Sequence, residues 1–238
     1  MKDTPAKAFE ANTKGRDFVV GDIHGHFEKL TALLKAVTFD ESKDRIFATG
    51  DLIDRGPMSE QVLNWLIQPW FNSVRGNHEQ MAIDSFAGHG DPERHARNGG
   101  EWFYRCSQQK RKSIIKHLTS LPFAFNIELT NGSTAGIIHA EPPGWQDGLD
   151  WNTALMLLSS PVAEQREAAK NQALYARTRI STMDSRTLNG VDTLYVGHST
   201  VIAPLTLANI TYLDTGCSFS DGRLTIIDTL SKTTISVT

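Results

Sequence analysis

Three short segments of the 238-residue chain contain side chains of the types that bind metal ions in proteins. The first, GDIHG, contains Asp22 and His24; the second, GDLIDRG, contains Asp51; and the third, RGNHE, contains Asn77. Carboxylate, imidazole and amide ligands together suit divalent ions such as Mn²⁺, Fe²⁺ or Zn²⁺ rather than a thiolate-selecting metal. The segments therefore predict a site for two metal ions, with Asp51 as the carboxylate that bridges them.

Two further histidines, His139 and His198, each follow an apolar run that is typical of a strand. Taken alone, such a histidine is more often a surface or core residue than a metal ligand. Their place after strands, like that of the three motifs, favours metal binding for both. Four other histidines, His26, His89, His95 and His117, lack such a context, and we expect them to be surface or core residues. His89 and His95 flank Asp91 and could weakly bind an ion.

Two arginines and a further histidine stand beside the predicted ligands in the sequence. Arg55 follows Asp54 in the second motif, and Arg75 precedes Asn77 in the third. A guanidinium group matches the oxygens of a phosphate, although surface ion pairs are the commoner use of arginine. His78 would point into the same site, and Asp54 could hold one of its ring nitrogens, raise its pKa and keep a proton available. The alternative for His78 is a purely supporting hydrogen bond.

The elements around these motifs alternate between strand and helix. Apolar runs predict strands at 17–21, 44–49 and 71–74, and helical spacing of apolar residues predicts helices at 27–37 and 59–67. This order predicts a parallel sheet with right-handed crossovers. Ligands of such sheets bind outside the carboxyl ends of the strands, which is where all three motifs fall.

The second half of the chain is mostly β in its pattern. An Asn131-Gly132 turn between two apolar runs predicts a hairpin. The fold class we expect is α/β, with two packed mixed sheets flanked by helices, in a single domain over residues 1–238. The remaining predictions are strands at 123–129, 135–139, 193–196, 209–213 and 223–228, helices at 80–86, 113–118 and 164–176, and loops at 88–100 and 141–150.

Composition excludes some classes of function. The formal net charge is −3, so the chain has no overall attraction for nucleic acid or an anionic membrane. Two cysteines, Cys106 and Cys217, form neither a disulfide framework nor a CxxC pair. The first residues show no apolar signal segment, and no run approaches the length of a membrane span. We therefore expect a cytoplasmic protein.

With these motifs in place, the chain resembles the metal-dependent phosphoprotein phosphatases of the serine/threonine type, and most of all their compact bacterial and phage-lambda branch. The similarity runs from about Phe18 to about Leu230. The three motifs match the family patterns GDxHG, GDxxDRG and GNHE. Four further segments match this branch: NGGEWF at 98–103, IHAE at 138–141, GHS at 197–199 and DTG at 214–216.

The resemblance implies a metallophosphoesterase fold with two divalent ions, Mn²⁺ first, with Fe²⁺, Zn²⁺, Ni²⁺ or Co²⁺ as alternatives. It implies His78 as the general acid, with Asp54 behind it, and Arg55, Arg75 and Arg177 around the phosphoryl group. Arg177 is the least secure of these, because Arg179 lies close by and Tyr175 stands where the family has tryptophan. The implied ligands of one metal are Asp22, His24 and Asp51, and those of the other are Asp51, Asn77, His139 and His198.

The activity implied is hydrolysis of phosphoserine and phosphothreonine in proteins or peptides by direct attack of a metal-activated hydroxide, with phosphotyrosine or phosphohistidine as further substrates. No regulatory subunit is expected. One alternative is a phosphodiesterase for dinucleoside polyphosphates or cyclic nucleotides on the same scaffold. The diadenosine tetraphosphate hydrolases typically carry glutamine in place of His24, which argues against that branch. A binding protein that has lost its chemistry is the other alternative, and it should lack some ligands or His78.

Overall fold

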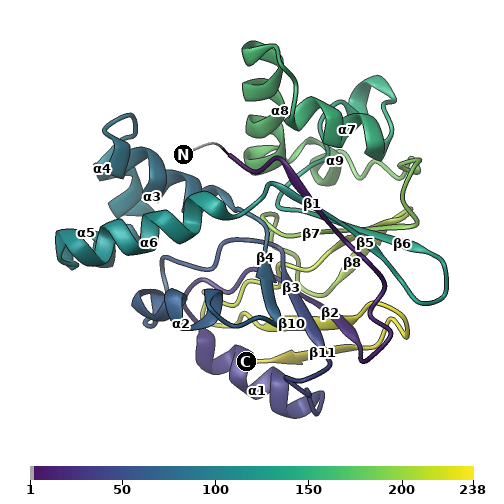
Figure 1. The fold of residues 1–238 in the computed structure, drawn as a ribbon, viewed down its shortest axis with the longest axis horizontal. Coiled ribbons are helices and arrows are strands. Elements are labelled where there is room, and N and C mark those ends of the chain that lie inside the picture. Colours follow the sequence, from purple (N-terminus) through teal and green to yellow (C-terminus); the bar gives the residue numbers. More distant parts are fainter. Residues whose placement is uncertain (1–2) are drawn as a thin grey trace.

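The structure is a computed structural model that describes residues 3–238. Two mixed β-sheets pack against each other, and helices cover their outer faces (Figure 1). This arrangement confirms the expected sandwich. Within the described residues, no helix is both long and apolar enough to cross a membrane.

One sheet has the strand order β11-β10-β2-β3-β4 over the part of the chain that the structure describes. The neighbours β2, β3 and β4 are parallel, as the strand–helix–strand pattern predicted, and β10 and β11 are antiparallel additions. Parallel pairing brings the carboxyl ends of three strands to one edge of the sheet. The strands are β2 (Asp17–Val20), β3 (Arg45–Ala48), β4 (Phe71–Ser73), β10 (Leu224–Asp228) and β11 (Thr234–Val237).

The other sheet has the order β1-β5-β6-β7-β9-β8. The central strands β6, β7 and β9 are parallel, and β5 and β6 form the hairpin predicted from Asn131-Gly132. Its strands are β1 (Ala6–Phe9), β5 (Ala124–Glu128), β6 (Thr134–Ile138), β7 (Thr193–Val196), β8 (Leu205–Leu207) and β9 (Ile210–Tyr212).

Alternation along the strands divides the core into layers. In β2, Val19 packs with Phe47 and Phe125 between the two sheets. Its neighbours Phe18 and Val20 point to the opposite face, which the helices cover. Both faces of these strands are buried, which is why their sequences are continuously apolar rather than alternating.

The helices fall into two groups. Residues of α1, α2 and α6 pack on the five-stranded sheet, while α7 and α8 pack on the six-stranded sheet (Figure 1). The helices are α1 (Phe27–Ala36), α2 (Val62–Leu66), α3 (Asn77–Ala87), α4 (Pro92–His95), α5 (Glu101–Arg105), α6 (Gln108–Ser120), α7 (Trp151–Leu158), α8 (Ala163–Tyr175) and α9 (Thr178–Ser181).

The structure corrects the sequence predictions in two places that affect the site. The segment 88–100 is not a loop: it contains α4 and a π-helical turn, Ala96–Gly100. The Asp91 side chain caps α4 by accepting the backbone N–H groups of Glu93 and Arg94, an arrangement too short to produce apolar periodicity. Helix α3 begins at Asn77 rather than at residue 80, so the GNHE motif forms its first turn.

Candidate metal centre and active site

The predicted metal ligands lie at the carboxyl ends of parallel strands in both sheets. In the five-stranded sheet, Asp22, Asp51 and Asn77 follow β2, β3 and β4. In the six-stranded sheet, His139 follows β6 and His198 follows β7. Because the two sheets pack face to face, these strand ends meet at one edge of the sandwich.

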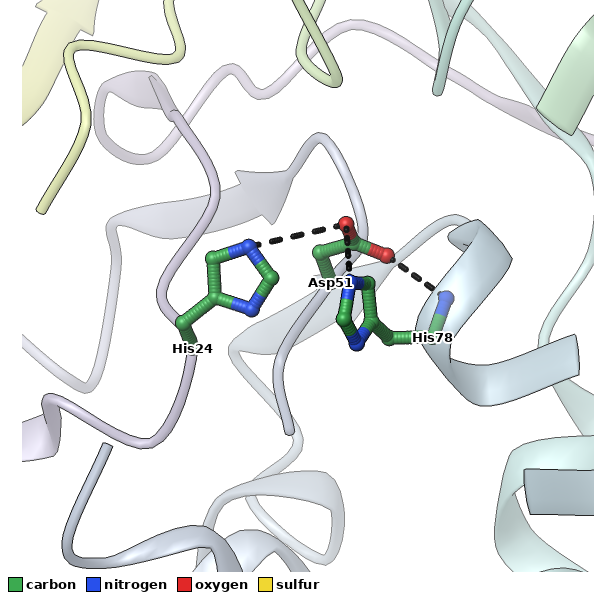
Figure 2. A group of neighbouring side chains, drawn as sticks. All are labelled: His24, Asp51 and His78. Carbon is green, nitrogen blue, oxygen red and sulfur yellow. Dashed lines mark hydrogen bonds and ion pairs between the residues drawn. The ribbon is translucent and has the colours of Figure 1, made fainter. Parts of the chain in front are cut away.

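Among the residues that the structure describes, His24, Asp51 and His78 form the first of two buried triads that could hold a metal ion (Figure 2). The Nε2 atom of His24 lies 3.6 Å from Oδ2 of Asp51, and Nε2 of His78 lies 3.9 Å from the same oxygen. The backbone N–H of His78 also donates to Asp51 Oδ1 at 3.0 Å. The bridge residue predicted from the sequence therefore stands between two imidazole rings.

The second triad contains Asp51, His139 and His198. Both histidines of this triad contact Asn77, whose Oδ1 lies 2.9 Å from His139 Nε2 and 2.9 Å from His198 Nδ1. Asp51 contributes Oδ1, which lies 3.5 Å from His139 Nε2. Asp51 thus belongs to both triads, with one carboxylate oxygen toward each.

Two of the histidines are held in the form that a metal needs. The Nδ1 atom of His24 lies 3.0 Å from the carbonyl of Ile53, and Nδ1 of His139 lies 2.8 Å from the carbonyl of Thr49. A carbonyl only accepts, so Nδ1 carries the proton and Nε2 presents a lone pair toward Asp51. Burial lowers the pKa of His24 to about 3 and also lowers that of His139, which keeps both rings neutral. These donors fit divalent cations.

Asp22 joins neither triad, although it lies in the same buried region. Its Oδ1 accepts from the Thr49 hydroxyl at 2.8 Å, and its Oδ2 accepts from the backbone N–H of His198 at 2.8 Å. Burial, then Asp214 and then Asp51 raise the pKa of Asp22 well above its usual value. Three buried carboxylates this close repel one another, and bound divalent cations would remove that repulsion.

Glu79 anchors the loop that carries the bridging carboxylate. Its Oε2 accepts the backbone N–H groups of Asp51 at 2.9 Å and Gly76 at 2.8 Å, and its Oε1 accepts that of Leu52 at 2.8 Å. The bond to Gly76 also caps the first turn of α3. Glu79 therefore fixes the second and third motifs to each other.

Five site residues have positive φ angles between 44° and 72°, a backbone conformation that residues other than glycine rarely adopt. Backbone strain of this kind persists where the surrounding structure fixes the conformation, and it is concentrated at functional sites. Here the carboxyl ends of strands turn sharply so that side chains face the shared edge. The residues are His24, Asp51, Asp54, Arg55 and His198.

His78 and Asp54 form a buried pair beside the first triad. The Nδ1 atom of His78 lies 2.7 Å from Oδ2 of Asp54. Burial lowers the pKa of His78, but the charges of Asp51 and Asp54 and the hydrogen bond to Asp54 outweigh it, so the net direction is upward. The ring is therefore suited to carry a proton on Nε2, although its place in the triad also makes it a candidate ligand.

Arg55 and Arg177 lie at the exposed border of the site. The guanidinium of Arg55 contacts Nε2 of His24 at 3.0 Å and Nε2 of His78 at 3.2 Å. Nε of Arg177 donates to Nε2 of His198 at 3.1 Å. The two arginines therefore stand beside different triads.

The structure does not bring Arg75 to this border, contrary to the sequence prediction. Its side chain is 1% exposed, and its NH1 group donates to Asp3 and Gln80. Its NH2 group donates to the carbonyls of Thr119 and Leu121, at the end of α6. Arg75 thus ties the N-terminal segment and α6 to the sheet, because its side chain leaves β4 away from the triads.

Arg179, which lies two residues from Arg177 and made that assignment less secure, makes only structural contacts among the described residues. It is 2% exposed, stacks over Trp145 and donates to the carbonyl of Arg186. Its backbone N–H donates to Glu141 at 2.5 Å, which ties the Arg177 segment to the end of β6.

Three residues near the site were given no role at the site by the sequence: His95 and Asp214, which are buried, and Trp102, which is half-buried. His95 and Trp102 both contact Asp54, and Asp214 lies near Asp22. For Trp102 and Asp214 the signal was present, since both belong to the NGGEWF and DTG segments. His95 gave none, because the sequence predicted a loop over 88–100 and did not reveal the short helix in which His95 lies.

Comparisons with known proteins agree with this geometry. Residues 18–201 match the family described as calcineurin-like phosphoesterase. The chain is 34% identical over 231 residues to serine/threonine-protein phosphatase 2 of Escherichia coli (strain K12), which covers 94% of this chain and 97% of that protein. It is 33% identical over 220 residues to serine/threonine-protein phosphatase 1 of Salmonella typhimurium, covering 91% and 93%.

More distant matches extend the likeness. A symmetrical bis(5'-nucleosyl)-tetraphosphatase of Hamiltonella defensa is 42% identical, but over 74 residues that cover 30% of this chain and 27% of that protein. A solved serine/threonine phosphatase from Saccharomyces cerevisiae shares the fold with a TM-score of 0.63, at 18% identity over 95% of this chain and 76% of that one. With the family match covering most of its length and two relatives matched nearly end to end, the chain belongs to the calcineurin-like phosphoesterases.

Proposed function

We propose that this phosphoesterase is a metal-dependent phosphomonoester hydrolase that acts on phosphoserine and phosphothreonine in proteins. One observation carries the proposal: two triads share Asp51, Asp54 holds His78 of the first triad, and Arg55 and Arg177 lie beside the triads. The relatives matched nearly end to end bear the name serine/threonine-protein phosphatase, which supports this substrate class.

Two divalent ions, with Mn²⁺ as the first choice, fit the donor set. Asp22, His24 and Asp51 would hold one, and Asp51, Asn77, His139 and His198 would hold the other. When bound, the ions would lower the pKa of a water molecule and offset the charge of the phosphate. Ligands from five strands would give both ions a fixed position at the shared sheet edge.

The chain's own residues then act on the phosphoryl group and the leaving group. Arg55 and Arg177 would hold the phosphoryl oxygens with charge-assisted hydrogen bonds. His78 would protonate the departing alkoxide from Nε2, while Asp54 holds Nδ1. Burial raises the pKa of both cysteine thiols, so neither is suited to act as the nucleophile.

The partner in this proposal is a phosphorylated protein or peptide, with no nucleic acid, membrane or regulatory subunit involved. The net charge of −3 supports the exclusion of nucleic acid. A cytoplasmic location stays a prediction from the sequence.

A metal analysis combined with a substrate panel tests the proposal. After incubation with Mn²⁺ and desalting, we expect about two ions per chain, because a dinuclear site binds two. The loaded protein should hydrolyse a phosphoserine peptide and p-nitrophenyl phosphate, and chelation should abolish both activities. Faster hydrolysis of diadenosine tetraphosphate or a cyclic nucleotide than of the peptide would reverse the choice of substrate. Absence of any hydrolysis would favour a binding protein.

Arg177→Ala and Arg179→Ala form a matched pair that separates a phosphate-binding role from a structural role. Arg177→Ala should lower kcat/KM for the peptide by roughly 10- to 100-fold, the worth of a hydrogen bond to a charged group. Its thermal stability should stay near that of the wild type, because Arg177 is exposed. Arg179→Ala should do the reverse and lose about 2 kcal/mol of unfolding free energy. Steady-state kinetics and thermal melts measure both effects. A stability loss in Arg177→Ala together with a kinetic loss in Arg179→Ala would contradict the assignment.

A further inference from the structure

The carboxylate of Asp54 is held by more than its pairing with His78. It is fully buried and accepts from His95 Nε2, which lies 3.0 Å from Oδ2 and 3.3 Å from Oδ1. It also accepts from the indole N–H of Trp102, which lies 2.8 Å from Oδ1. Three donors from α3, α4 and α5 thus converge on one carboxylate.

The direction of these hydrogen bonds follows from their chemistry. An ionised carboxylate only accepts, so the Nε2 atom of His95 carries a proton. The Nδ1 atom of His95 lies 3.0 Å from the hydroxyl of Tyr104, which can then donate to it. The hydrogen bonds from His78 and His95 lower the pKa of Asp54 against the effect of burial. Hydrogen bonds therefore run from the Tyr104 hydroxyl to His95 and from His95 to Asp54, and both ring nitrogens of His95 have a partner.

Local backbone features allow this network to form. A side chain at Gly100 would collide with the His95 ring, so glycine lets the ring lie against the π-helical turn. Gly99, with a φ of 95°, approaches the backbone of Arg55 and accepts its N–H at 3.2 Å. The segment from His95 to Trp102 therefore contacts both the Asp54 carboxylate and the Arg55 backbone.

We propose that His95 and Trp102 are positioning residues for the general acid: they fix the orientation of the Asp54 carboxylate, which in turn fixes the His78 ring. With only the bond to His78, the carboxylate could rotate about its own side-chain bonds. The indole N–H on Oδ1 and the imidazole N–H on Oδ2 remove that freedom. The Nε2 atom of His78 is then held toward the site, 3.2 Å from Arg55. Among the described residues, no hydrogen bond joins either side chain to a residue of the metal triads, so the effect passes through Asp54.

This inference rests on the proposed function, and its test compares leaving groups. His95→Leu removes the donor, and His95→Gln replaces it with an amide N–H at a similar reach. Trp102→Phe keeps the ring and removes only the indole donor. For a phosphoserine peptide, whose alkoxide needs a proton, kcat should fall roughly 10- to 100-fold in His95→Leu and Trp102→Phe, the worth of a hydrogen bond to a charged group. For p-nitrophenyl phosphate, the loss should be about threefold or less, since this leaving group barely needs the acid.

Further measurements separate positioning from packing. His95→Gln should recover most of the peptide activity, and the Mn²⁺ content of every variant should equal that of the wild type. Combining His95→Leu with His78→Asn should add little to the loss from His78→Asn alone, because both changes remove the same proton donor. His89→Asn and Trp65→Phe serve as controls, since His89 is exposed and the Trp65 indole N–H makes no hydrogen bond among the described residues.

The outcomes are distinct. Equal losses on both substrates, or a falling metal content, would assign His95 and Trp102 to packing and overturn the inference while leaving the proposed function intact. An inactive wild type would overturn both. Should His95→Leu fail to fold, Trp102→Phe alone decides, because it preserves the aromatic contact with Phe103.

Discussion

Asp51→Asn should remove the metal centre and nearly all activity while leaving the fold in place. Asp51 is the residue shared by both triads, with Oδ1 toward His139 and Oδ2 toward His24. An amide has one oxygen, so it cannot serve two cations as a bridging carboxylate does. We expect a Mn²⁺ content well below two ions per chain and a fall in kcat/KM of roughly 10³-fold or more, since bound cations contribute several kcal/mol.

Thermal melts supply the control for this prediction. Mn²⁺ should raise the melting temperature of the wild type, because a ligand that binds only the native state stabilises it, and this shift should be lost in Asp51→Asn. Asp147→Asn is a matched change of an exposed carboxylate and should behave as the wild type. Full metal content in Asp51→Asn would contradict the assignment of Asp51 as the bridge.

His78→Asn should slow hydrolysis of a phosphoserine peptide by roughly 10²–10⁴-fold, the usual worth of a positioned general acid. The Nδ1 atom of His78 is held 2.7 Å from Asp54, and the charges of Asp51 and Asp54 outweigh burial and raise the pKa of the ring, which favours its protonated form. The loss on p-nitrophenyl phosphate should be much smaller. Steady-state kinetics on both substrates measures the difference.

Metal content decides between the two roles open to His78. As the acid, it is not needed for metal binding, and His78→Asn should keep its Mn²⁺. As a ligand of the triad with His24 and Asp51, it should lose metal together with activity on both substrates. Equal losses on the two substrates, accompanied by metal loss, would transfer His78 from the acid to the ligand set.

Much of the site was predictable because it depends on local sequence. Each motif follows a short apolar strand, and parallel strands bring their carboxyl ends to one edge. The residue types also specify the chemistry, since Asp51 and His139 offer oxygen and nitrogen donors that suit divalent ions. Placing these residues together required only the strand positions and the parallel order.

The directions of the arginine side chains depended on contacts far away in the chain. Arg75 lies two residues from Asn77 and Arg55 lies four residues from Asp51, yet Arg75 binds the end of α6 and Asp3 instead of facing the site. Those partners lie 44 and 72 residues away, so no local pattern reveals them. Distant contacts also distinguish Arg179 from Arg177, because Arg179 packs over Trp145 and its backbone N–H donates to Glu141.

The sequence by itself determined the strand ends, the candidate metal ligands and the family, because each of these depends on a few consecutive residues. Only the tertiary structure decided that His95 and Trp102 would meet Asp54, across 41 and 48 residues of chain. A short capped helix and a π-helical turn bring them there, and neither has the apolar periodicity by which helices are recognised. Packing of separate segments around one buried carboxylate is a property of the folded chain alone.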